Sequence, residues 1–207
     1  MANGNGKNGY SRLAFLDTET TGAAPGKHEL LDIGVVICDA VAPYGITDSF
    51  AAKVKPQRIQ DAEPIALEIN KYNEADWVDA VPEAQAIEEF VYKTRGCSLW
   101  GWNVGFDRAF LEPAMNRAGH TLETAGLDFT WYDVKVLFIQ WAKLTGRDAD
   151  FAPRYGLNSS ARRAFSIENE DAHRALPDAM LTYRMFVRLQ DEYEKLTERL
   201  KQNTLGL

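Results

Sequence analysis

The chain has 207 residues, of which 30 are Asp or Glu and 23 are Lys or Arg, so its formal net charge is −7. This charge argues against a generic basic coat for nucleic acid and leaves room for an acidic protein that recruits cations. With 45% hydrophobic and 11% aromatic residues the chain can bury a full core, and its length suits one domain. Disordered and fibrous classes are therefore excluded.

No part of the sequence is typical of a membrane or secretory segment. No window approaches the roughly 18 consecutive apolar residues of a membrane helix, and the first ten residues lack the apolar core of a secretory signal. Ala2 stands where N-myristoylation needs glycine. Cys38 and Cys97 each lie inside an apolar run, the usual setting of a buried thiol. We expect a soluble, cytoplasmic protein without disulfides.

The first quarter of the chain predicts three strands after a disordered tail. Residues 1–10 are rich in Gly and Asn and show no periodicity, so the domain is expected to span 11–201. Three apolar runs joined by short connections then predict an antiparallel meander. The runs lie at 13–17, 29–39 and 46–56, with a polar turn at 18–22 between the first two.

The rest of the chain alternates helices with strands. Pro113 falls inside one predicted helix and predicts a kink or a break there. The expected order is a helix at 83–95, a strand at 97–103, a helix at 106–119, a strand leading into a helix at 127–146, a short helix at 155–165, a long helix at 175–202, and a flexible tail at 202–207. This pattern predicts one α/β domain whose mixed central sheet joins the meander to two parallel strands, flanked by helices.

Two acids stand at the end of the first predicted strand. Asp17 and Glu19 are two residues apart, so in an extended segment their side chains point to the same face. When two carboxylates lie this near to each other, their repulsion forces one of them to keep its proton unless a cation lies between them. Two solvated acids at a strand end are the simpler reading of this pair taken alone.

Two more acids and a histidine add to this pattern. Asp107 follows a buried strand and a tight turn, and Asp178 follows Pro177 in the expected first turn of the last helix. Each could be an ordinary helix N-terminal acid. His173 precedes Asp178 by five residues, a spacing that turns side chains about 140° apart on a helix, so they converge only if His173 lies in the preceding loop. His28 and His120 receive no role.

Four carboxylates without a Cys/His cluster favour a hard cation such as Mg²⁺ or Mn²⁺ over zinc. Four acids can hold two such ions about 4 Å apart, an arrangement that stabilises the attacking and leaving oxygens of phosphoryl displacement. Histidine can accept a proton near neutral pH and so could activate a water. The residues together favour a metal-dependent phosphodiesterase.

Three motifs carry a family resemblance. FLDTETTG, WNVGFDRAFL and HRALPDA occur in that order, with the histidine at an H-x4-D spacing. The chain from Arg12 to Leu189 resembles the DnaQ-like 3′-to-5′ exonucleases of the DEDDh branch, which includes proofreading subunits, RNase T and oligoribonuclease. The resemblance implies an RNase H-like fold.

The resemblance also implies a role for each matching position. The metal-binding acids are Asp17, Glu19, Asp107 and Asp178, and the general base is His173. The substrate-binding residues are Thr20, Thr21 and Gly22, whose turn meets the terminal nucleotide, with Asn103 and Phe106 flanking the third acid.

Two positions depart from the family pattern. Trp102 stands where relatives often have histidine, and Asp32-Ile33-Gly34 stands where many have Glu-Ile-Gly. Neither departure is expected to touch a metal ligand, although Trp102 is expected to alter how the penultimate base is held.

The implied function is a two-metal 3′-5′ exonuclease that removes nucleoside 5′-monophosphates from single-stranded nucleic acid, with DNA favoured. Two alternatives stay open: an RNA-trimming or short-oligonucleotide exoribonuclease, and a non-catalytic nucleic-acid-binding subunit with the same fold. Binding of the substrate is expected to be poor without metal, because two divalent cations would add about +4 where the phosphate lies.

Weaker signals concern substrate and partners. Aromatics around the motifs could stack on bases, although most are expected in the core. Arg154, Arg162 and Arg163 could follow a phosphate backbone, although a solvated surface is the simpler explanation for each one. Gln202–Leu207 has the look of peptides that dock into bacterial sliding clamps, against the simpler reading of a frayed terminus. A homodimer, seen in several relatives, is also possible.

Overall fold

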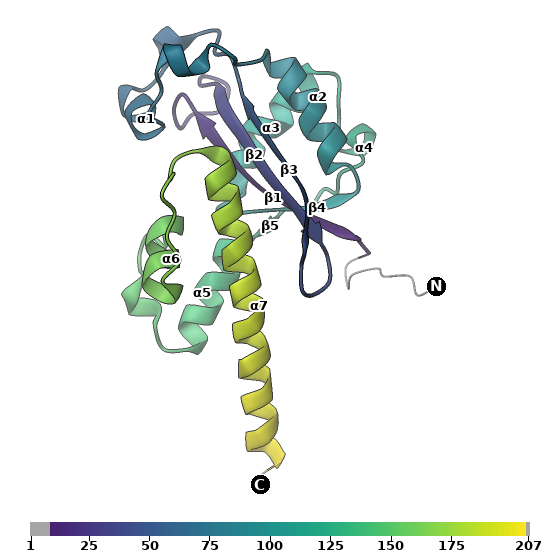
Figure 1. The fold of residues 1–207 in the computed structure, drawn as a ribbon, viewed down its shortest axis with the longest axis vertical. Helices are drawn as coiled ribbons and strands as arrows, with labels where there is room; N and C mark the ends of the chain where they lie inside the picture. The colour runs from purple at the N-terminus through teal and green to yellow at the C-terminus, as the bar shows by residue number, and fades with distance from the viewer. Residues whose placement is uncertain (1–8, 206–207) are drawn as a thin grey trace.

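The computed structural model describes residues 9–205, which form one mixed five-stranded sheet covered by helices (Figure 1). The strand order is β3-β2-β1-β4-β5. The β1–β2 and β2–β3 pairs are antiparallel, whereas the β1–β4 and β4–β5 pairs are parallel. The predicted meander and mixed sheet are confirmed. The strands are β1 (Arg12–Thr20), β2 (Leu30–Asp39), β3 (Ile46–Lys53), β4 (Cys97–Gly101) and β5 (Tyr132–Asp133).

Helices cover both faces of this sheet. α2 and α3 pack on one face, while α5, α6 and α7 lie on the other (Figure 1). The α-helices are α1 (Pro64–Ile69), α2 (Glu83–Thr94), α3 (Gly105–Arg117), α4 (Leu122–Ala125), α5 (Val134–Leu144), α6 (Leu157–Phe165) and α7 (Ala175–Leu205). Three short 3₁₀ turns lie at Ile59–Asp61, Glu74–Trp77 and Asp148–Asp150.

The two-residue period of a strand divides the core into two clusters. On β1, Ala14 and Leu16 pack toward α2 and α3, whereas Leu13 and Phe15 pack toward α5 and α7. β2 obeys the same alternation, with Val35 on the α2–α3 side and Cys38 on the α7 side. Continuing this alternation places Asp17 and Glu19 of β1, and Asp32 and Gly34 of β2, on the face toward α7.

The structure corrects several predicted boundaries. The predicted turn at 18–22 is wrong for its first three residues, because β1 stays paired with β2 as far as Thr20. α3 runs uninterrupted from Gly105 to Arg117, so no break occurs at Pro113. The short helices α1 and α4 have no counterpart among the predicted elements, and the predicted strand before α5 shrinks to two residues.

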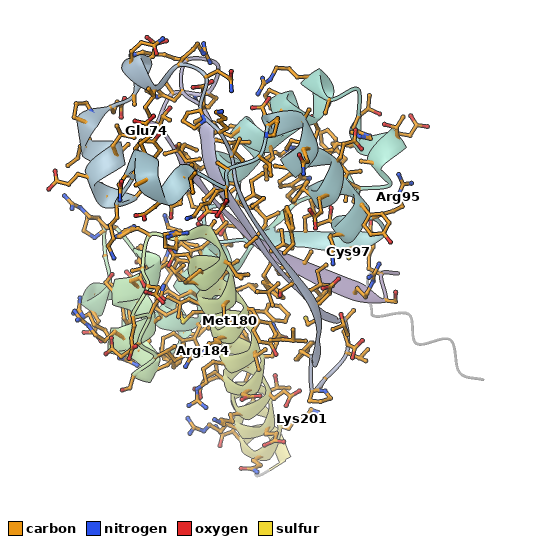
Figure 2. All side chains as sticks on the ribbon, turned by 45° about the horizontal axis from the view of Figure 1, so that its top comes forward. Glu74, Arg95, Cys97, Met180, Arg184 and Lys201 are labelled. Atoms are coloured by element: carbon orange, nitrogen blue, oxygen red, sulfur yellow. The ribbon has the colours of Figure 1, made fainter. Side chains whose placement is uncertain are left out.

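The structure describes only part of the two predicted tails. Residues 1–8 of the predicted N-terminal tail lie outside the described residues. α7 continues to Leu205, so the first four residues of the predicted tail at 202–207 are helical, and 206–207 are not described. α7 projects well beyond the sheet (Figure 1), and Figure 2 places Lys201 on the projecting part, far from Glu74 at the other end of the molecule.

Cys38 and Cys97 are buried free thiols, as expected. Among residues 9–205, no helix combines the length and the apolar character that crossing a bilayer requires.

Candidate active site

Strand β1 carries the first two acids toward the start of α7. Asp17 lies opposite Gly34 and Glu19 opposite Asp32 in the β1–β2 register, which then shifts between Glu19 and Thr20. Both acids are partly buried and share the face that α7 covers. The backbone pairing of β1 therefore fixes where these two carboxylates can be.

The third acid reaches the same place from the other side of β1. Asp107 lies in the first turn of α3, where the helix dipole favours a negative charge, and only 3% of its surface is exposed. Thr18, the residue between Asp17 and Glu19, donates from Oγ1 to Asp107 Oδ1 at 2.9 Å. This hydrogen bond joins β1 to α3 at the site.

The fourth acid and the histidine come from the junction of a loop with α7. His173 has a φ of 66° and lies just before the helix, whereas Asp178 lies in its first turn, as predicted. The His173 backbone N–H donates to Asp178 Oδ2 at 3.0 Å. One ligand atom from each of Glu19, His173 and Asp178 lies within 4.8 Å of the other two. Asp17 and Asp107 lie outside this group of three, but Asp17 is near enough to Asp107, Glu19 and Asp178 for their charges to raise its pKa.

Burial, and then repulsion between neighbouring acids, raises the pKa values in this cluster. Burial, together with the neighbouring Asp107, Glu19 and Asp178, raises the pKa of Asp17 well above its ordinary value. Burial and the charges of nearby acids raise the pKa of Glu19 to about 8, and burial raises the pKa of Asp107 to about 7. Each shift means that the ionised carboxylate is unfavourable in this buried place without a compensating cation, and for Asp17 and Glu19 the neighbouring acids add to the effect.

Asp178 is also buried, but hydrogen bonds stabilise its ionised form. Burial raises its pKa, while the hydrogen bond from His173 and the side chains of two asparagines oppose this rise. Asn158 and Asn169 both donate from Nδ2 to Asp178 Oδ1, at 3.4 and 2.5 Å. Neither asparagine was predicted, and only the three-dimensional arrangement brings them to Asp178.

The predicted nucleotide-binding turn is tightly ordered by its own hydrogen bonds. Thr20 Oγ1 donates to the Gly22 carbonyl at 2.8 Å, and Thr21 Oγ1 accepts from the Glu29 N–H at 2.9 Å. Gly22 packs against His28, since a Cβ at Gly22 would lie 2.5 Å from the imidazole ring. Backbone groups of the turn are paired as well, because Asn70 Nδ2 donates to the Thr20 carbonyl at 2.9 Å and the Glu63 N–H donates to the Thr21 carbonyl at 2.8 Å. All three residues of the turn are buried.

The segment before Asp107 is fixed by β5 and α5. Asn103 is exposed with a φ of 67°, and its backbone N–H donates to Asp133 Oδ1 at 3.0 Å. Phe106 is half-buried and packs on Phe110 with ring centroids 5.1 Å apart. Trp102 is 8% exposed, and its Nε1–H donates to the Tyr155 carbonyl at 2.9 Å. Trp102 is thus a core residue with little surface for a base.

A fifth acid, Asp32, lies opposite Glu19, one of the predicted ligands. It is 4% exposed, faces Glu19 across the β1–β2 pair, and is one of the charges that raise the Glu19 pKa. Arg174 forms an ion pair with it, Nε to Oδ2, at 3.3 Å. The Asp-Ile-Gly pattern was the available signal in the sequence, but only the sheet register puts Asp32 beside Glu19.

The donor set fits hard divalent cations. The converging groups are carboxylates with one imidazole, and their mutual repulsion is what such cations would relieve. Arg174, the cationic side chain that lowers the Glu19 pKa, is already paired with Asp32.

Comparison with known proteins agrees with this geometry. Residues 14–186 match the family model RNase_T, which describes exonucleases. The chain belongs to this family, the DnaQ-like 3′-to-5′ exonucleases. No curated protein matches the exonuclease chain in sequence.

Solved structures share the fold of this exonuclease-family chain. Exonuclease I of E. coli in complex with a dT13 oligonucleotide superposes with a TM-score of 0.73 at 19% identity, covering 92% of this chain and 43% of that one. A 3′-exonuclease that recognises a histone mRNA stem-loop superposes with a TM-score of 0.66 at 18% identity, covering 88% of this chain and 64% of that one. This chain thus spans less than half the length of exonuclease I, and the likeness establishes the RNase H-like fold.

Proposed function

We propose that this protein is a DEDDh-type, metal-dependent 3′-5′ exonuclease that removes nucleoside 5′-monophosphates from single-stranded nucleic acid. The observation that supports the proposal is the gathering of four carboxylates and His173 from β1, α3, α7 and the loop before α7 near the end of β1. A module that only binds nucleic acid gains nothing from buried acids that repel one another and the phosphate. This argues against the non-catalytic alternative.

The residues divide into cation holders and a proton acceptor. Asp17, Glu19, Asp107 and Asp178 would hold two Mg²⁺ or Mn²⁺ ions. When bound, these ions supply positive charge for the attacking and leaving oxygens and the scissile phosphate. His173, exposed at the rim and adjacent to Glu19 and Asp178, takes the proton from the attacking water. The other residues shape the place where the 3′ end is held.

Substrate residues follow from the surroundings of the acids. The family resemblance supports contact between the turn of Thr20, Thr21 and Gly22 and the terminal nucleotide. Asn103 and Phe106 would contact the next one, since both adjoin Asp107 and keep exposed or half-exposed surface.

We favour DNA over RNA as the substrate. Support comes from exonuclease I, whose structures with dT13 and dA16 concern single-stranded DNA. The RNA alternative is kept because a second relative recognises a histone mRNA stem-loop. Either substrate presents a free 3′-OH and the same phosphodiester linkage.

An end-labelling assay tests the reaction. Matched 5′-labelled single-stranded DNA and RNA would be incubated with Mg²⁺, with Mn²⁺ and with EDTA, next to a DNA blocked by a 3′-phosphate. We expect stepwise shortening of the unblocked strands, faster for DNA, release of nucleoside 5′-monophosphates, and no cleavage in EDTA. Internal cuts, cleavage that survives EDTA, or no cleavage at all would contradict the proposal.

Binding without metal forms a second part of the assay. The acidic site repels phosphate when no cation is bound, so we expect affinity for an uncleavable phosphorothioate strand to fall at least tenfold in EDTA. Equal affinity with and without Mg²⁺ would place the main binding surface elsewhere.

Partners and location are further proposals. We propose a cytoplasmic location and a homodimeric assembly. Exonuclease I forms a complex with the C-terminal peptide of SSB, which makes protein partners reasonable in this family. Docking of Gln202–Leu207 into a sliding clamp as an extended peptide would require the last turn of α7 to unwind. A clamp pull-down with and without these six residues tests this, and equal recovery would exclude it.

A further inference from the structure

Asp32 is a buried carboxylate that the proposed chemistry does not use. It lies on β2 with 4% of its surface exposed, and burial raises its pKa, while Arg174 and the Ala175 N–H oppose this rise. Asp32 Oδ2 accepts from Arg174 Nε at 3.3 Å and, at a longer 3.4 Å, from the backbone N–H of Ala175. A single carboxylate oxygen therefore holds two consecutive residues.

Those two residues connect the proposed base to α7. Arg174 directly follows His173, and Ala175 is the first residue of the helix. The Arg174 guanidinium also lies over the Trp77 ring, 5.6 Å from its centroid. Trp77 is itself fixed to β2, because its Nε1–H donates to the Leu31 carbonyl at 3.1 Å. The start of α7 is thus attached to β2 by a carboxylate and by an aromatic ring.

Gly34 allows this attachment to be close. It is two residues after Asp32 and faces α7 as well, and a Cβ there would lie 2.2 Å from the Ala175 carbonyl carbon and from the Leu176 nitrogen. Any side chain at this position would push the helix start away from β2. Asp32 and Gly34 together form a seat, which we call the Asp-x-Gly seat, for residues 174–176.

The contacts of the Asp-x-Gly seat bear on the positions of His173 and Asp178. The His173 N–H is bonded to Asp178 Oδ2, so the two residues move as a unit with the helix start. Glu19 and Asp17 lie directly across the β1–β2 pair from Asp32 and Gly34. The contacts of Asp32 and Gly34 with the start of α7 therefore determine the distance between the β1 acids and the His173–Asp178 unit.

We infer that Asp32 and Arg174 are positioning residues, which hold His173 and Asp178 at the correct distance from Glu19. This inference rests on the proposed function, since it takes His173 as the base. A misplacement of about 1 Å can reduce the rate about 100-fold without weakening substrate binding. The loss should accordingly appear in kcat rather than in KM.

Steady-state kinetics on a single-stranded oligonucleotide form the first test. Asp32→Asn keeps an acceptor but loses the charge that pairs with Arg174, and it should lower kcat by about 30- to 100-fold with KM within about threefold. Arg174→Ala should give a similar loss. Asp32→Glu should restore most of the activity, since glutamate can still pair with Arg174. The matched control is Asp48→Ala, which removes a strand aspartate paired with Lys93 of α2 at 2.8 Å and should leave kcat unchanged.

Amide hydrogen exchange measured without metal or substrate gives a second, independent test. Asp32→Asn and Arg174→Ala should accelerate exchange at His173 and Ala175 while leaving the amides of β1 protected. Exchange equal to wild type at both positions, with wild-type kcat, would overturn the inference. A general acceleration throughout the sheet, without a kcat-specific loss, would assign Asp32 to stability alone and overturn it as well.

Cation affinity separates positioning from ligation. Calorimetry with Mn²⁺ should show a smaller loss for Asp32→Asn than for Glu19→Gln, and an equal loss would make Asp32 a ligand and contradict the inference. Failure of the proposed function is distinguishable: a wild-type protein without nuclease activity would refute the exonuclease assignment. The exchange experiment would still report whether the seat holds His173.

Discussion

The two sides of the active site are held by different forces. Asp17 and Glu19 form a strand wall, which the backbone pairing of β1 with β2 fixes within the sheet. His173 and Asp178 form a loop wall, which depends on side-chain contacts to Asp32, Asn158 and Asn169 and on a left-handed residue just before a helix. The strand wall has a fixed backbone, but its carboxylates repel each other. The carboxylate of the loop wall accepts several hydrogen bonds, but the position of this wall depends on a small number of side-chain contacts.

This difference fits separate proposed roles for the two walls, cation binding for one and proton transfer for the other. Charged ligands belong on a rigid element, because only fixed geometry keeps mutually repelling carboxylates close enough to share cations. A proton acceptor needs access to water, and His173 has it at the exposed rim. Changes to the strand wall should therefore affect cation binding, and changes to the loop wall should affect placement of the base.

The largest effect is expected from Asp17→Asn. Loss of one cation-binding carboxylate should reduce kcat/KM by about 10⁴-fold. Because its pKa is raised, Asp17 must hold a proton when the metal-free chain folds, and asparagine removes this cost, so the metal-free variant should melt about 2–4 °C higher, as about 1 kcal/mol of relief implies. Thermal denaturation in EDTA next to the nuclease assay measures both. Wild-type activity would show that the strand wall is not the site.

His173→Ala should lower kcat by about 10³-fold, because it removes the proton acceptor and leaves the four carboxylates in place. Mn²⁺ affinity from calorimetry should change little. His120→Ala is the matched control, since His120 Nε2 lies 2.9 Å from Glu88 Oε1, away from the acids of the site. A loss of Mn²⁺ affinity as large as that of Glu19→Gln would make His173 a cation ligand instead of the base.

Gly34→Ala should reduce kcat by about 10²-fold, because the added Cβ displaces the start of α7 and with it the loop wall. Gly45→Ala provides the control, since the nearest atom to its new Cβ would be Asp39 Oδ2 at 3.6 Å. Asp17 and Glu19 should keep their positions in a crystal structure of the variant. Undiminished activity would mean that the loop wall tolerates displacement.

The metal-free protein should lose stability as pH rises. The pKa of Glu19 is raised to about 8 and that of Asp107 to about 7, so the folded state keeps protons that the unfolded chain releases at lower pH. The stability from these protons is present below about pH 4 and is lost as pH rises toward 8. Denaturant unfolding in EDTA should show a fall of about 2 kcal/mol between pH 5 and 8, which Mg²⁺ reverses. A rise over this range would contradict the assigned shifts.

The smallest effect is expected outside both walls, at the exposed Arg162 of α6. If it follows the phosphate backbone, Arg162→Ala should raise KM about two- to threefold and reduce the slope of log affinity against log salt by about one. Arg199→Ala, near the far end of α7, serves as the control. An unchanged salt slope would leave Arg162 as a solvated surface residue.

Much of the fold could be predicted because its signals are local. The apolar run at 29–39 needs burial on both faces, and Pro82 precedes a helix whose apolar residues recur at helical spacing. The ends of elements were less predictable where hydrogen bonding between strands keeps polar residues in a strand. Thr18, Glu19 and Thr20 are polar and resemble a turn, yet hydrogen bonding to β2 keeps them in the strand.

The sequence by itself led to the proposal of the five site residues, through the resemblance of its three motifs to an exonuclease family. It also determined the strand wall, since side chains two residues apart in a strand must share a face. Only the tertiary structure decided what holds the loop wall. Asp32 and Arg174 are 142 positions apart along the chain. Their contact depends on the strand register and on a glycine that lets a helix approach, and neither of these leaves a periodic signal in the sequence.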